Sequence, residues 1–252
     1  MVYFVGAGPG AEDLITVRGL EYLKKADVII YAGSLVNPDL LKAAGEECRI
    51  YNSAYMNLDE VLEVMEEAER AHLMTVRLHT GDPSIYGAIR EQMDELRARN
   101  IPFEICPGVS SMSGAAASLQ MEYTLPGISQ SIIISRAEGR TAVPKGENLR
   151  ELAVHRSTMI LFLSSGLAEK VKEELLAGGY RGDTPAAVVY KATWKEEKIL
   201  RTTLIKLPEE MERAQITKTA LIIIGEALGE DYERSRLYDP TFTTEYRRGR
   251  EA

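Results

Sequence analysis

The 252-residue sequence is poor in cysteine, with only Cys48 and Cys106, and it contains a single tryptophan. Two cysteines provide neither a disulfide framework nor the spacing of a zinc finger, so they indicate a reducing compartment and predict a cytoplasmic protein. No run approaches the ~20 apolar residues that a membrane span needs. The N-terminus also lacks the basic stretch and long apolar region of a secretory signal. The sequence therefore predicts a soluble protein that is not secreted.

Basic residues are scarce relative to acidic ones. The 30 lysines and arginines are outnumbered by 38 aspartates and glutamates, which gives a net charge of −8. A chain with this balance repels polyanions at long range, so general nucleic-acid binding is disfavoured. An anionic ligand would have to be held by a local cluster of arginine and lysine.

Several catalytic motifs are absent as well. The sequence has no G-x-S-x-G nucleophile elbow and no glycine-rich loop that ends in Gly-Lys-Ser/Thr. Its three histidines, His72, His79 and His155, lie on two helix ends and a loop of the expected structure, so they predict neither a catalytic triad nor a zinc site. We expect no metal.

Apolar runs typical of buried strands alternate with amphipathic helical patterns in the first half of the chain. The expected strands are 2–5, 27–31, 75–78 and 101–105, and the expected helices are 11–25, 58–71 and 85–99. This alternation predicts an α/β domain with a mainly parallel sheet.

A second series of strands begins after a segment rich in glycine, serine and alanine. The expected strands are 131–135, 158–163, 186–190 and 220–225, with a helix over 168–177. The segment 198–207 could pair with 186–190 and make this sheet mixed. We therefore expect an N-terminal α/β domain over 1–118, a C-terminal α/β domain over 119–228 and a charged tail over 229–252.

The glycine-rich loop after the first strand has two interpretations. Its Gly6-x-Gly8-x-x-Ala11 spacing matches the dinucleotide-binding fingerprint, whose glycines let backbone amides approach a pyrophosphate. However, Pro9 removes one such amide, and the second expected strand ends without an acidic residue to bind a ribose. Dinucleotide binding and a merely tight turn both remain open on this pattern alone.

Two further loops follow expected strands. Asp82, within Thr80–Ser84, either accepts hydrogen bonds from a ligand or caps the next helix. The loop Cys106–Ser111 is the third loop that directly follows a strand and carries a glycine, and these loops are here called strand exits. Because ligands of open α/β sheets bind at the carboxyl ends of the strands, these exits indicate a site built from backbone and small side chains.

Basic side chains gather after two strands of the second series. Arg136, Arg140 and Lys145 lie in one loop, which is either a solvated surface loop or a site for carboxylates. Lys191 and Ala192 follow the strand 186–190, and the nearby Trp194 has packing as its simplest interpretation.

Taken in order, the loop motifs resemble those of the tetrapyrrole methylases, which use S-adenosylmethionine (SAM). The motifs are Val5–Gly10, Thr80–Pro83, Cys106–Ser111 and Lys191–Thr193. Within this family, the branch that methylates C-11 of precorrin-4 or cobalt-precorrin-4 in corrin (cobalamin) synthesis is the most similar. The features shared with that branch are Tyr31–Val36, Gly81–Ala88, Tyr190–Trp194 and the tail segment Ser235–Thr243.

The resemblance implies two α/β domains with SAM in the cleft between them, usually in a homodimer. By position, the implied cofactor-binding residues are Pro9, Gly81, Asp82, Ile85, Ser110, Ser111, Ser165, Ala192 and Ala220. The expected substrate-binding residues are Ser34, Arg136, Arg140, Lys145 and Lys191. Methyl transfer from SAM requires mainly alignment, so we expect no indispensable general base and give Asp82 a positioning role.

Three alternatives stay open. One is a nucleotide-binding or redox module without transferase activity. The second is methylation of a precorrin at another ring position. The third is an RNA or diphthine methylase of the same fold, which the net charge of −8 opposes.

Overall fold

The computed structural model describes residues 1–250, and it leaves the side chain of Ser34 outside the described part. The contacts divide the chain into two units. Unit 1 comprises Met1–Ser118 together with Lys191–Glu197, and unit 2 comprises Leu119–Tyr190 and the chain from Lys198 onward. The short segment Lys191–Glu197 therefore packs with unit 1, although it lies within the second half of the sequence.

Unit 1 is built on a five-stranded, all-parallel sheet, as the alternating pattern predicts. The strand order is β3-β2-β4-β1-β5. The strands are β1 (Val2–Gly6), β2 (Val28–Tyr31), β3 (Arg49–Asn52), β4 (Thr75–His79) and β5 (Phe103–Cys106). The helices are α1 (Val17–Lys25), α2 (Leu58–Arg70), α3 (Ile89–Ala98) and α4 (Ser111–Leu119).

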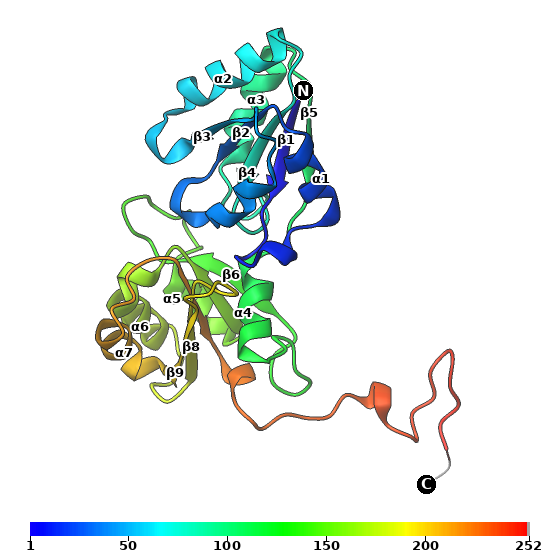
Figure 1. Ribbon diagram of the computed structural model, residues 1–252. Helices are drawn as coiled ribbons and strands as arrows, with labels where there is room; N and C mark the ends of the chain where they lie inside the picture. Colours follow the sequence, from blue (N-terminus) through cyan, green and yellow to red (C-terminus); the bar gives the residue numbers. More distant parts are fainter. Residues whose placement is uncertain (251–252) are drawn as a thin grey trace. The chain divides into compact units, whose positions relative to one another are not determined.

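Helices cover both faces of this sheet, because its central strands are apolar on both sides (Figure 1). Phe4 and Ile30 face α2 and α3, whereas Val5 and Ile29 face α1. Strands buried on both faces read as continuous apolar runs, which is why the sequence reveals them.

Two helices of unit 1 begin later than the periodicity predicts. A 3-10 turn at Glu12–Leu14 ends before α1, whose true N-cap is Thr16, which accepts a hydrogen bond from the Gly19 amide. Helix α3 begins at Ile89 rather than 85, because Tyr86 and Ala88 take left-handed backbone conformations. The loop after β4 is therefore longer than expected.

Unit 2 holds a mixed five-stranded sheet of order β6-β7-β10-β8-β9 (Figure 1). Its strands are β6 (Ile132–Arg136), β7 (Thr158–Phe162), β8 (Pro185–Tyr190), β9 (Lys198–Thr203) and β10 (Ala220–Ile224). Only β6 and β7 pair in parallel; β10 is antiparallel to β7 and β8, and β9 is antiparallel to β8. The predicted mixed sheet is confirmed, and the segment 198–207 supplies the added strand over Lys198–Thr203, whereas its remaining residues form a 3-10 turn and the start of a helix.

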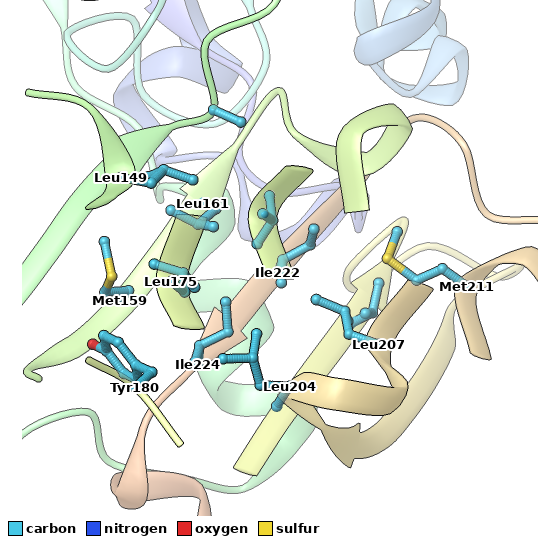
Figure 2. Close-up of a cluster of buried hydrophobic side chains, with 14 of the residues drawn as sticks. Leu149, Met159, Leu161, Leu175, Tyr180, Leu204, Leu207, Met211, Ile222 and Ile224 are labelled. Carbon is cyan, nitrogen blue, oxygen red and sulfur yellow. The ribbon is translucent and has the colours of Figure 1, made fainter. Parts of the chain in front are cut away.

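One face of the second sheet is covered by α5 (Leu149–Leu152), α6 (Ala168–Ala177) and α7 (Leu207–Arg213). Figure 2 shows Leu175 of α6 and Leu207 of α7 among side chains from β7 and β10, such as Leu161 and Ile222. All four of these side chains are fully buried. Among residues 1–250, no helix is both long enough and apolar enough to cross a membrane.

Candidate functional site

The loops that leave β4, β1 and β5 meet at one edge of the unit 1 sheet, since these three parallel strands are neighbours. Gly8 and Gly81 form an isolated antiparallel bridge, in which the Gly81 amide donates to the Gly8 carbonyl at 2.8 Å and the Gly8 amide donates back at 3.3 Å. The loops therefore touch through backbone rather than through side chains.

Glycine is required at these contacts because there is no space for a side chain. A Cβ at Gly108 would lie 2.2 Å from the Gly81 carbonyl oxygen, and one at Gly6 would lie 2.6 Å from the same atom. Gly81 itself has a φ of +60°, a conformation that favours glycine. The three glycine-bearing exits thus form one compact backbone surface.

Asp82 holds this surface together through its carboxylate. Its Oδ2 accepts a hydrogen bond of 2.8 Å from the Gly108 amide, and its Oδ1 accepts from the amide and hydroxyl of Ser84. Partial burial raises the pKa of Asp82, but the hydrogen bonds from Ser84 and Gly108 outweigh it and hold the pKa below its ordinary value. The side chain is therefore ionised at neutral pH and links the β4 and β5 exits.

The other predicted residues of the first half lie on the same loops. Helix α4 begins directly at the β5 exit, where the Ser110 carbonyl accepts hydrogen bonds from the amides of Ser113 and Gly114. A Cβ at Gly81 would lie 3.2 Å from the Ser111 amide and hydroxyl, and one at Gly114 would lie 2.7 Å from Pro9. The structure thus brings Pro9, Gly81, Asp82, Ser110 and Ser111 together, and half-buried Ile85 lies in the loop that follows.

The segment 191–197, here called the strap, packs on the glycine-rich loop of β1. The indole N–H of Trp194 donates to the Pro9 carbonyl at 3.0 Å, and the Ala11 amide donates to the Thr193 hydroxyl at 3.0 Å. Ala192 is buried within the strap. Trp194 is therefore more than a packing residue: it binds the loop from about 185 residues away in sequence. The available signal was a lone tryptophan close behind a strand exit.

The Lys191 ammonium group has two partners within the strap. Its Nζ lies 4.8 Å from the centroid of the Trp194 ring and 3.8 Å from the Glu196 carboxylate. Glu197 accepts hydrogen bonds from the Thr193 amide at 2.5 Å and from the Ser118 hydroxyl at 2.6 Å. These contacts fix the strap, including the left-handed backbone of Lys191 and Thr193.

Two predicted cofactor residues belong to unit 2 and touch each other there. The Ser165 hydroxyl donates to the Ala220 carbonyl at 2.9 Å, and both residues are buried. Ala220 is the first residue of β10, so this hydrogen bond joins the turn after β7 to the start of the neighbouring strand.

In the basic loop after β6, Arg136 donates hydrogen bonds to backbone carbonyls of the same loop and so stabilises its conformation. The Arg136 guanidinium donates to the carbonyls of Thr141 at 3.1 Å and Ala142 at 2.6 Å. Arg140 and Lys145 have exposed side chains. The remaining predicted substrate residue, Ser34, has its side chain outside the described part of the chain.

The unit 1 site suits an organic ligand that donates hydrogen bonds. An ionised carboxylate has about four acceptor positions. Within residues 1–250, Asp82 uses three of them, which leaves one on Oδ2 for a ligand hydroxyl or ammonium group. The serine hydroxyls and loop backbone supply further neutral partners, so the arrangement favours orientation of a bound ligand.

Comparison with known proteins gives a consistent family. A family model described as Tetrapyrrole (Corrin/Porphyrin) Methylases matches residues 1–208. The cobalt-precorrin-4 C(11)-methyltransferase of Methanocaldococcus jannaschii is 54% identical over 248 residues, which cover 98% of this chain and 96% of the relative.

Solved structures agree with this result. A cobalamin biosynthetic enzyme, cobalt precorrin-4 methyltransferase, is 48% identical with a TM-score of 0.89, and the match covers 91% of this chain and 96% of that one. The uroporphyrin-III C-methyl transferase from Thermus thermophilus, complexed with S-adenyl homocysteine, is 29% identical with a TM-score of 0.76, over 90% and 92% of the two chains. The chain therefore belongs to the tetrapyrrole (corrin/porphyrin) methylases.

Proposed function

We propose that this protein transfers a methyl group from SAM to C-11 of precorrin-4 or cobalt-precorrin-4 in the synthesis of the corrin ring. The observation that carries the proposal is the 54% identity to a cobalt-precorrin-4 C(11)-methyltransferase over 98% of the chain. The backbone-lined site of unit 1 supports it, because the matched family model covers all three of its strand exits.

The residues present at this site fit SAM. Its ammonium and ribose hydroxyls donate hydrogen bonds, and Asp82 has one acceptor position left for such a donor. Pro9, Gly81, Ser110, Ser111 and Ala192 supply small side chains and backbone that permit close approach. We assign further cofactor contacts to Ile85, Ser165 and Ala220.

Catalysis in this proposal rests on positioning. When bound, SAM supplies a methyl group already activated by a sulfonium. Asp82 and the rigid glycine contacts fix the ligand's orientation, and such alignment contributes up to ~7–11 kcal/mol in favourable cases. The strap packs on the loop at Pro9 through the Trp194 indole and the buried Ala192, which limits the access of water to that loop. No general base on this chain is required.

Substrate carboxylates are assigned to Arg140 and Lys145, whose exposed side chains extend from the loop after β6. For Arg136 and Lys191, substrate binding stays a prediction that requires them to exchange their present partners. We also propose a cytoplasmic homodimer.

Replacing Asp82 with asparagine should weaken cofactor binding by about 10- to 100-fold, because a hydrogen bond to a charged acceptor contributes roughly 1.5–3 kcal/mol. The dissociation constant of S-adenosylhomocysteine is measured by fluorescence, since the only tryptophan of the chain contacts the Pro9 loop. Asp183→Asn is the control, because that exposed aspartate pairs with Arg181 in unit 2. If Asp82→Asn kept the wild-type affinity and turnover, Asp82 would have no role in binding the cofactor.

The activity itself is tested with precorrin-4 and cobalt-precorrin-4 in separate incubations with methyl-labelled SAM. We expect the label at C-11 of at least one of them, located by NMR of the product. A label at another ring carbon would assign a different precorrin position to the enzyme. No transfer to either compound would reject the proposed function.

A further inference from the structure

The C-terminal segment 234–250, here called the arginine tail, is rich in arginine. It carries five arginines against Asp239 and Glu245, a net charge of +3 in a protein of net charge −8, and it directly follows the acidic residues Glu230, Asp231 and Glu233. The remaining residues together therefore carry −11. Such a local concentration of arginine is what a polyanionic ligand requires on an otherwise acidic protein.

Within the tail, the pKa of Asp239 is lowered first by hydrogen bonds from Thr241 and then by the charges of Arg236 and Arg247, which lie nearby. Surface arginines elsewhere commonly pair with carboxylates, as Arg97 does with Asp94 and Arg181 with Asp183. Among the described residues, no ion pair involves the arginines of the tail, and the side chains of Arg234, Arg236, Arg248 and Arg250 are exposed.

The arginine tail nevertheless has a defined local structure, drawn in orange to red in Figure 1. Arg247, the third of its five arginines, donates to the carbonyls of Leu237 at 2.9 Å and Asp239 at 2.6 Å. The Arg250 amide donates to the Pro240 carbonyl at 2.8 Å, which closes the turn that contains Arg248. These hydrogen bonds give the turn that carries Arg248 and Arg250 a local structure of its own.

Apolar and aromatic side chains of the same tail are exposed beside these charges. Tyr238 is 82% exposed and Tyr246 is 93% exposed, and Leu237 and Phe242 are also open to solvent. Flat aromatic rings next to exposed guanidinium groups match a ligand that is itself a ring with carboxylates at its rim. A nucleic acid fits less well, because the acidic remainder of the chain repels a long polyanion over more of its length than a small polycarboxylate.

We infer that the arginine tail is a second binding element for the tetrapyrrole substrate, in which its arginines pair with the substrate's carboxylates and its aromatic side chains contact the ring. The inference rests on the proposed function. It accounts for the charge that a polycarboxylate needs, since Arg136 and Lys191 are occupied within their own loops. The match to the Methanocaldococcus jannaschii relative covers 98% of this chain, so most of the tail lies within the matched length.

The test uses uroporphyrin, a stable tetrapyrrole polycarboxylate, as the probe for the full-length protein. The double variant Arg248→Gln/Arg250→Gln should bind it roughly three- to tenfold more weakly than the wild type, as expected for two partly exposed ion pairs. Its affinity should also depend less on salt. The charge-matched control is Arg18→Gln/Arg49→Gln, which removes two exposed arginines from unit 1 and should leave binding unchanged.

Steady-state kinetics separate this role from a general defect. In the tail variant the KM for the tetrapyrrole should rise by the same factor, whereas kcat and the affinity for S-adenosylhomocysteine stay at the wild-type level. Equal uroporphyrin affinity in the tail variant and the wild type overturns the inference. A change in sedimentation with unchanged uroporphyrin affinity also overturns it, since the tail then contacts a second copy of the chain. If the wild type methylates neither precorrin-4 nor cobalt-precorrin-4, the proposed function is rejected. The difference in uroporphyrin affinity between the wild type and the tail variant still tests the inference about the tail.

Discussion

Gly108→Ala should lower the unfolding temperature by roughly 6–12 °C and abolish cofactor binding, because the new methyl group has no space. Its Cβ would lie 2.2 Å from the Gly81 carbonyl oxygen and 2.7 Å from the Gly6 Cα. Both neighbours are backbone atoms within the sheet edge, so the clash cannot be relieved by a side-chain rotation. Overpacking of this kind costs about 3 kcal/mol, which sets the expected shift for a chain of this size.

The matched control is Gly45→Ala. A Cβ at Gly45 would have no heavy atom within 4 Å, and this glycine has no positive φ. The substitution should leave the unfolding temperature unchanged or raise it slightly, since alanine restricts the unfolded chain. Differential scanning calorimetry and a titration with S-adenosylhomocysteine measure the two effects. If Gly108→Ala matched the wild type in both, the β4 and β5 exits would not be in the contact described here.

This prediction connects the fold to the chemistry. A parallel sheet brings the carboxyl ends of β4, β1 and β5 to one edge, and glycine lets the loops that follow them touch through backbone. Asp82 then links two of these loops without using all of its acceptor positions. Orientation of a ligand that brings its own reactive group requires this kind of rigidity more than it requires an acid or a base.

Much of this site could be predicted from sequence, because the signals are local. Each exit is an apolar strand followed by a glycine, and the carboxyl ends of neighbouring parallel strands must share an edge. The position of Asp82 follows from the same reasoning. The edge strand β3 was missed for a complementary reason: Arg49 and Ile50 are exposed, so the strand lacks the apolar run of a buried one.

Other parts depend on contacts between residues far apart in sequence. No local pattern indicates that Trp194 donates to the Pro9 carbonyl, or that Arg136 donates to the carbonyls of its own loop. His79 is a further case. The sequence places it in a loop, whereas it is the last residue of β4 and is only 4% exposed. Its burial has a consequence for stability.

His79→Phe should remove the part of the acid-induced loss of stability that His79 contributes in the wild type. Burial and the nearby charge of Arg77 lower the pKa of His79 to about 3 from an ordinary value of 6.5. Between these two pH values the unfolded chain binds a proton that the native chain does not. The contribution of His79 is therefore fully favourable above pH 6.5 and is lost as the pH falls toward 3. At pH 4 the loss amounts to about 3 kcal/mol.

Phenylalanine is a suitable replacement because the surroundings of the ring are apolar on one side. The His79 ring stacks on Phe4 with centroids 6.1 Å apart, and within residues 1–250 its buried Nε2 has no hydrogen-bond partner. Removing an unsatisfied buried polar atom is neutral or stabilising when the shape is kept. The variant should thus be at least as stable as the wild type at pH 7.

Arg77 does not obscure this result, although it lies on the same strand and is also buried. Burial lowers its pKa only to about 10, and its guanidinium donates to Gln92 and to the Ile30 carbonyl, so it stays charged throughout the acid range.

The free energy of unfolding is measured in urea at several pH values from 7 to 4. Carboxylates add a slope of their own, but the difference between His79→Phe and the wild type isolates the histidine. The exposed-site variant His155→Phe should follow the wild-type curve, and parallel curves for all three proteins would show that His79 takes up its proton equally well in the folded chain.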